Sequence, residues 1–158
     1  MQPEKLIELF NAHKVTYLII GASACAVHGF PRATRDLDIF IEASPRNAER
    51  VLGALSEFGY DVTDLTIDDV LHYKLLFRQY WLDTDIHPFA KGISFSSAWK
   101  KKFRAPFNGV PAAYVSLNDL IRMKRIANRP KDQEDLRQLL HIRKILKERA
   151  KPKRKKVR

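Results

Sequence analysis

Residues 36–41, Asp-Leu-Asp-Ile-Phe-Ile, constrain the fold more than any other stretch of this chain. Side chains two positions apart on a β-strand point to the same face. Asp36 and Asp38 therefore share one face, while the apolar residues that alternate with them share the other and can enter a core. Two adjacent carboxylates repel each other unless a cation lies between them. Because a hard divalent cation such as Mg²⁺ prefers oxygen ligands, this strand predicts a metal site.

The composition indicates a folded intracellular domain. With 158 residues, 45% of them hydrophobic and 30% charged, the chain is long enough for one domain with a real core. No apolar run approaches the roughly 18 residues that a transmembrane helix needs, and the amphipathic start is unlike a signal peptide. Cys25 is the only cysteine, which excludes an internal disulfide and a thiolate zinc cluster. We expect a cytoplasmic protein without membrane contact.

The net charge of +11 is concentrated near the end of the chain, where the last eight residues carry six positive charges and no negative one. We expect a single domain over residues 1–148 and a disordered basic tail over residues 149–158. Such a tail suits RNA or another polyanion, and it also resembles a short nuclear-import signal. A merely solvating role for the tail stays open at this point.

Strand and helix signals alternate along the chain. The apolar run of residues 15–20 predicts a buried strand that ends at Gly21, and Ser44-Pro45 begins a helix that Gly59 ends. The pattern as a whole predicts an α+β (mixed α/β) fold, a mixed sheet flanked by helices with a helical C-terminal part at about residues 116–148. The other expected strands are 36–41, 73–77, 81–87, 103–107 and 112–115, and the other expected helices are 3–12, 22–28, 94–102, 117–127 and a last one ending near 148.

A third acidic position lies on the strand expected at residues 81–87. Alternation places Asp83, Asp85 and His87 on one face. The pattern alone leaves open whether Asp83 or Asp85 joins the first pair. For His87 a structural role is preferred over metal binding.

The order of these motifs resembles the DNA-polymerase-β-like nucleotidyltransferase superfamily, in which a turn of Gly and Ser precedes Asp-hydrophobic-Asp and a later strand supplies a third carboxylate. The wider pattern, His28-Gly29 before residues 32–38 and then residues 115–136, resembles small bacterial nucleotidyltransferases related to abortive-infection (AbiE-type) toxins. The resemblance spans about residues 15–140. One departure is Ala22, which stands where the family usually has Ser or Gly.

The resemblance implies an enzyme that uses Mg²⁺ or Mn²⁺ to transfer a nucleoside monophosphate from an NTP to an acceptor hydroxyl. The acceptor would be RNA or tRNA, a protein or a small molecule, and a toxin–antitoxin or phage-defence role with a cognate antitoxin is implied. Asp36, Asp38 and Asp85 would be the catalytic and metal-binding residues. The residues expected to bind nucleotide are Gly21, Ala22, Ser23, Arg35 and Lys124.

Several interpretations remain open at this level. Lys124 falls on an apolar helical stripe, so it either faces phosphate or extends its stem along half-buried surface. Asp132 and Asp135 are interpreted as capping and linking residues between two helices. Two other function classes also fit the chain: a non-catalytic nucleotide- or partner-binding module on the same fold, and an RNA-binding protein acting through its basic tail.

Overall fold

The strand expected at residues 36–41 forms with those bounds as β2 (Asp36–Ile41), in the middle of a six-stranded sheet. This computed structural model describes residues 2–153. The strand order is β3-β4-β2-β1-β6-β5. β2 pairs antiparallel with β1 (Tyr17–Ile20) and parallel with β4 (Asp83–His87), so the sheet is mixed. The remaining strands are β3 (Leu75–Phe77), β5 (Phe103–Phe107) and β6 (Val110–Tyr114).

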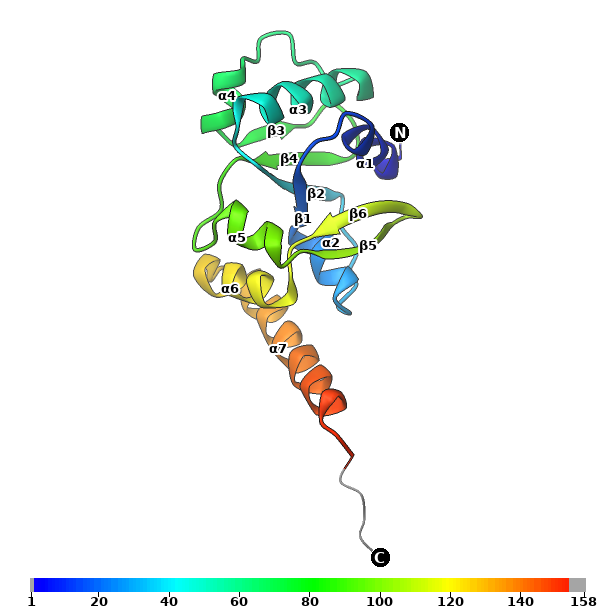
Figure 1. Ribbon diagram of the computed structural model, residues 1–158, viewed down its shortest axis with the longest axis vertical. Helices are drawn as coiled ribbons and strands as arrows, with labels where there is room; N and C mark the ends of the chain where they lie inside the picture. The colour runs from blue at the N-terminus through cyan, green and yellow to red at the C-terminus, as the bar shows by residue number, and fades with distance from the viewer. Residues whose placement is uncertain (1, 154–158) are drawn as a thin grey trace, which may run out of the picture.

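The helices divide into two groups at opposite ends of the structure (Figure 1). α1, α3 and α4 lie at the end that holds β3, whereas α6 and α7 lie at the other end, from which α7 projects. None of the described helices is both long enough and apolar enough to cross a membrane. The bounds are α1 (Pro3–Ala12), α2 (Gly21–Val27), α3 (Pro45–Phe58), α4 (Ile67–His72), α5 (Phe95–Lys100), α6 (Leu117–Ala127) and α7 (Pro130–Ala150).

Helix ends follow the local sequence. The Ser44 side chain accepts a hydrogen bond from the backbone N–H of Asn47 at the start of α3, and Gly59 ends that helix with a φ of 108°.

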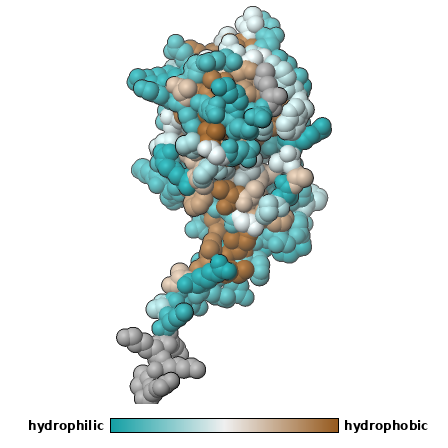
Figure 2. All heavy atoms as spheres, turned by 90° about the vertical axis from the view of Figure 1, so that its right-hand side faces the viewer, coloured by the Kyte–Doolittle hydropathy of each residue, from teal (hydrophilic) through white to brown (hydrophobic). Residues whose placement is uncertain are grey.

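Along α7, apolar side chains face the body of the protein only in part, and Leu146 is 50% exposed. Figure 2 shows apolar side chains gathered toward this end of the molecule.

The core explains why only one stretch of β2 is open to a ligand. Leu37, Ile39 and Ile41 are at most 1% exposed, as the alternation predicts. Phe40 is also buried because the Phe95 ring of α5 packs edge-on against it, with ring centroids 5.1 Å apart. The face that carries the two aspartates is therefore covered at the far end of β2 and accessible at its beginning.

The mixed α/β fold with a helical C-terminal part is confirmed, with some differences in detail. α4 was not expected; it begins with a capping box in which the side chains of Thr66 and Asp69 bond each other's backbone N–H. β4 begins at Asp83 rather than at residue 81. α7 ends at Ala150, two residues past the predicted domain boundary, and residues 154–158 of the predicted tail lie outside the described residues.

Candidate active site

The register of β2 and β4 brings four aspartates onto one face of the sheet. Asp36 is the partner of Asp83 and Asp38 is the partner of Asp85 across the parallel pair. Directly opposed residues on paired strands project to the same face, so the acidic positions form two neighbouring cross-strand pairs. This juxtaposition arises from chain segments nearly 50 positions apart, which only the sheet brings together.

Asp38, Asp85 and His87 form a compact cluster of potential metal ligands. One ligand atom from each residue lies within 4.8 Å of the others. His87 Nε2 is 2.9 Å from Asp38 Oδ1, and the side chains are 14–23% exposed. Two carboxylates suit Mg²⁺, and an added imidazole also suits transition metals. Asp36 is exposed and is not a member of this cluster, and its backbone N–H donates to Thr34 Oγ1 at 3.0 Å.

Two cations from the edge of the sheet neutralise Asp85. Lys74 Nζ lies 3.0 Å from Oδ2 and an Arg78 guanidinium nitrogen lies 2.8 Å from Oδ1. Burial by itself raises the pKa of Asp85, but hydrogen bonds from Arg78 and Lys74 outweigh it, so the pKa lies below its usual value. Asp83 has only a longer contact of 3.8 Å with Arg78. The cluster thus includes Asp85 and leaves Asp83 out.

Gly21 lets the backbone approach Asp38 more closely than any other residue would. Its φ is +68°, and a Cβ placed on it would lie 2.6 Å from Asp38 Oδ2. A side chain at this position would therefore displace the carboxylate from its place in the cluster. The next residue, Ala22, is 7% exposed. Ala22, the residue that departs from the family pattern, is therefore a small buried side chain.

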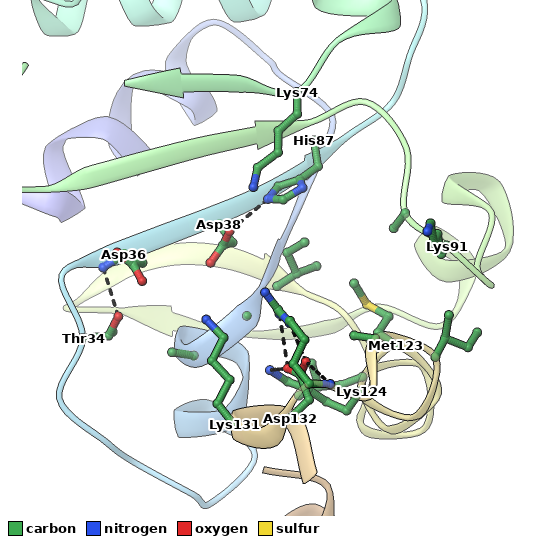
Figure 3. A pocket seen from close by; sticks show the side chains of 18 of the residues that line it. Thr34, Asp36, Asp38, Lys74, His87, Lys91, Met123, Lys124, Lys131 and Asp132 are labelled. Carbon is green, nitrogen blue, oxygen red and sulfur yellow. Dashed lines mark hydrogen bonds and ion pairs between the residues drawn. The ribbon is translucent and has the colours of Figure 1, made fainter. Parts of the chain in front are cut away.

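A pocket of about 440 Å³ lies between the carboxylate face of the sheet and the helices α6 and α7 (Figure 3). Asp38 and His87 project into it from the strands, and Lys124 and Asp132 approach from the helices (Figure 3). The cationic residues of the lining outnumber its carboxylates, which favours an anionic ligand. These cations are Arg32, Lys74, Lys91, Lys124, Arg129 and Lys131, and the acidic residues are Asp36, Asp38 and Asp132.

Lys124, one of the residues expected to bind nucleotide, is paired with two carboxylates in this structure. Its ammonium is 3.1 Å from Asp132 and 2.8 Å from Asp135, and it is 7% exposed. Burial lowers the pKa of this ammonium, but its hydrogen bond to Asp135 and the nearby charges outweigh that effect and raise it. Asp132 also accepts from the backbone N–H and the side chain of Arg129 at the start of α7. The contacts of Lys124 are thus those of a helix–helix link.

The other expected nucleotide contacts divide between pocket and surface. Gly21 and Ala22 line the pocket, as Lys124 does, whereas Ser23 and Arg35 are outside its lining. Ser23 borders a separate shallow hollow. Arg35 is exposed, and its backbone carbonyl accepts a hydrogen bond from the N–H of Asp83. Ser23 therefore lies outside the lining of the pocket that Asp38 enters.

Sequence reasoning missed the cations on the β3 side of the site. Leu76 is the register partner of Asp85, so Lys74 and Arg78, two positions to either side, share the face of that carboxylate. The alternation of Lys74, Leu76 and Arg78 would have been a usable signal if the expected strands at 73–77 and 81–87 had been paired antiparallel. For His87 a structural role was preferred, but its ring also contacts Asp38 of the carboxylate cluster directly.

Solved structures with this fold include antibiotic-modifying enzymes. The lincosamide antibiotic adenylyltransferase LnuA, bound to lincomycin, superposes with a TM-score of 0.62 at 19% identity, covering 90% of this chain and 98% of that one. The antibiotic-resistance factor ANT(2'')-Ia in solution gives 0.60 at 16% identity over 92% and 89%. The same factor in complex with adenylyl-2''-tobramycin gives 0.58 at 14% identity over 94% and 96%. At these identities the likeness establishes the fold.

A search of curated proteins finds no significant relative. The family model described as "Nucleotidyltransferase of unknown function (DUF6036)" matches residues 3–149, nearly the whole chain. That match includes both carboxylate strands, the pocket and the two C-terminal helices. The chain therefore belongs to the DUF6036 family of nucleotidyltransferases of unknown function.

Proposed function

We propose that this protein is a metal-dependent enzyme that transfers a nucleoside monophosphate from an NTP to an acceptor hydroxyl and releases pyrophosphate. The observation that carries the proposal is the pairing of Asp38 with Asp85 across β2 and β4, where Asp38 lines a pocket with a surplus of cations. Carboxylates arranged for a cation, next to cations arranged for an anion, are what a metal–triphosphate complex requires.

The donor set fits a divalent cation. Asp38, Asp85 and His87 converge within 4.8 Å, and Gly21 leaves the space that the Asp38 carboxylate occupies. In the proposal Asp36, Asp38 and Asp85 are the carboxylate ligands of Mg²⁺ or Mn²⁺, with Asp36 turning in from its exposed position. The metal, when bound, supplies Lewis-acid polarisation of the phosphoryl group and lowers the pKa of the acceptor hydroxyl.

The remaining roles belong to the residues around the cluster. Asp85 is the residue proposed to accept the proton of the acceptor hydroxyl, once Lys74 and Arg78 leave its oxygens. Lys74 lines the pocket, so its ammonium can exchange the carboxylate for a phosphate of the NTP. Lys91 and Lys131 face the same space and would offset the charge of the triphosphate. Lys124 would hold α6 and α7 together beneath the phosphates.

Three acceptor classes remain candidates within the proposal: RNA or tRNA, a protein hydroxyl and a small molecule. The names of the structural relatives, a lincosamide adenylyltransferase and a factor seen with adenylyl-tobramycin, support a small-molecule hydroxyl. Membership of a toxin–antitoxin or phage-defence system is supported only by the sequence resemblance to AbiE-type proteins. Because a lone carboxylate cluster does not prove turnover, a non-catalytic nucleotide-binding module is the competing function.

Label transfer tests the proposal directly. The protein is incubated with each α-³²P-labelled NTP, Mg²⁺ or Mn²⁺ and a cell extract, and RNA, protein and small-molecule fractions are counted. We expect one fraction to acquire label with the wild type and not with Asp38→Asn. Asp64→Asn, an exposed aspartate outside the pocket, is the matched control and should behave as wild type. No transfer from any NTP, or equal transfer by Asp38→Asn, would reject the enzymatic function.

A further inference from the structure

The net positive charge of this protein lies in its C-terminal part, from α6 to the last residues of the sequence. Residues 1–115 contain 13 basic and 13 acidic residues, so the whole net charge of +11 resides in residues 116–158. Charge segregation of this degree is typical of a surface that meets a polyanion. It includes the two helices α6 and α7 and therefore does not depend on the terminal residues alone.

The acidic side chains buried between these helices do not offset that charge at the surface. Asp119 is 2% exposed and lies 3.0 Å from the ammonium of Lys101, while Asp132 and Asp135 are 0% and 2% exposed and bind Lys124. Each of these carboxylates is already engaged by a cation inside the fold. Exposed basic side chains on the two helices include Arg122, Arg125, Lys144 and Lys147, while Arg137 pairs with Glu134 and Arg143 donates to Asn118 Oδ1.

The basic side chains converge on a groove of about 730 Å³ beside the two helices. Arg122 and Arg125 border it from α6, and Arg143 and Lys147 border it from α7. Arg143 and Lys147 also border a second hollow together with Lys144 and Lys151, so the cationic surface continues along α7. A run of this length is longer than one phosphate needs and suits several phosphates of a polymer.

The groove adjoins the candidate active site. Ile126 lines both the groove and the carboxylate pocket, and its side chain is 45% exposed. One side of α6 thus faces the nucleotide pocket, and the neighbouring side carries the arginines of the groove. The groove and the pocket therefore meet at Ile126.

We propose that this basic groove, bordered by Arg122, Arg125, Arg143 and Lys147, binds the backbone of an RNA strand whose terminal hydroxyl enters the pocket over Ile126. The proposal rests on the proposed function and names its acceptor. RNA is chosen over a protein because the groove offers cations in series for phosphodiesters, and over DNA because the 3′ end of RNA offers two hydroxyls, 2′ and 3′, where DNA offers one. In the step, the RNA hydroxyl oxygen bonds the α-phosphorus, the bond to the β-phosphate oxygen breaks, pyrophosphate leaves and the proton passes through a carboxylate to water.

Binding is measured first without NTP or metal, so that catalysis plays no part. The full-length protein is titrated into a fluorescein-labelled single-stranded RNA of 20 nucleotides, and anisotropy is followed at several salt concentrations. The test variant is Arg125→Glu/Lys147→Glu, with one exposed position on each helix. Lys5→Glu/Arg46→Glu on α1 and α3 is the control with the same change in charge. Arg122→Gln/Arg143→Gln is a milder second test in case charge reversal disturbs the fold.

We expect the groove reversal to weaken RNA binding at least tenfold and the salt slope to fall by about 1.4, the value for two lost single-strand phosphate contacts. The control should stay within twofold of wild type. Equal weakening by both pairs would reduce the effect to net charge and overturn the groove. DNA of the same sequence binding as tightly as RNA would overturn the RNA assignment.

The two proposals can fail separately. If wild type binds RNA through the groove but transfers no label from any NTP, the proposed function fails and the groove stands. If label reaches RNA but Arg125→Glu/Lys147→Glu keeps the same KM for RNA, the groove fails and the enzyme stands. A raised KM with kcat kept is the result expected from a surface that binds the acceptor away from the reacting atoms.

Discussion

Two clusters of ionised side chains lie on either side of the same pocket (Figure 3). On the helix side, Asp132 and Asp135 are 0% and 2% exposed and share the ammonium of Lys124. On the sheet side, Asp38 and Asp85 are 23% and 14% exposed. Both clusters join carboxylates to cations, but the carboxylates of the first are buried between α6 and α7, whereas those of the second are partly exposed.

This difference in access indicates what each cluster is for. Breaking a buried ion pair leaves an uncompensated charge in a low-dielectric interior, so the helix-side cluster contributes to the fold. An accessible cluster can exchange partners, because water or a metal ion can replace Lys74 or His87 beside the carboxylates at little cost. A cation such as Lys124 can therefore line a binding pocket and still serve mainly to link two helices.

The largest expected effect is the loss of activity in Asp38→Asn. If the sheet-side cluster binds the metal, this change should lower label transfer at least a thousandfold, about 4 kcal/mol in the activation barrier. The unfolding free energy in urea should change by less than about 1 kcal/mol, since the side chain is partly exposed. Loss of stability together with activity would contradict the contrast between the clusters.

The opposite result is expected for Lys124→Met on the helix side. Removing the ammonium leaves Asp132 and Asp135 close together in a buried site with only Arg129 and Arg32 as cationic partners, and we expect a loss of about 3 kcal/mol of unfolding free energy. Urea denaturation followed by circular dichroism measures it. Lys131→Met, in the same pocket lining but exposed, is the control. A stable Lys124→Met protein with weakened NTP binding would restore the phosphate role that the sequence suggested.

A smaller effect is expected in the pH dependence of the unfolding free energy, through Asp132 of the helix-side cluster. Burial alone would raise the pKa of Asp132, but hydrogen bonds from Arg129 and Lys124 outweigh it and lower the pKa to about 2. A depressed pKa adds stability that is present above the unfolded pKa, near 3.8, and lost as the pH falls through 2. The stability gap between wild type and Asp132→Asn should therefore shrink by about 2 kcal/mol between pH 6 and pH 2. A gap that does not change with pH would contradict this ion pair.

The sequence predicted the sheet-side cluster better than the helix-side one. The alternation of residues 36–41 gave β2 its bounds and the shared face of Asp36 and Asp38, because period-2 patterning is local. The partners of Lys124 depend on how α6 crosses α7, and that tertiary property leaves no periodic signal. Sequence reasoning did assign a linking role to Asp132, whose position just after Pro130 marks a helix start.

The missed elements have a similar cause. α4 is short and contains two aspartates, so its apolar pattern was too weak to predict a helix. The Thr66–Asp69 capping box was the one local signal of a helix start there. The cations on Asp85 come from either side of β3, a strand of three residues. Strand pairing set by so few residues is defined by register against β4 rather than by local sequence.

The smallest expected effect is a change in the Mn²⁺ affinity of the sheet-side cluster when one of the cations on Asp85 is removed. In Lys74→Met one of the two cations that compete for Asp85 is gone, so Mn²⁺ should bind about tenfold more tightly, roughly 1.4 kcal/mol. Mn²⁺ binding is followed by electron paramagnetic resonance in the absence of NTP. Lys91→Met, which removes a lysine of the pocket lining without a carboxylate contact in the described structure, should leave Mn²⁺ affinity within about twofold. NTP binding should weaken in both variants, because both remove positive charge from the pocket. Mn²⁺ affinity that falls in Lys74→Met would mean that this lysine orients Asp85 for the metal, and the sheet-side cluster would then be as fixed as the helix-side one.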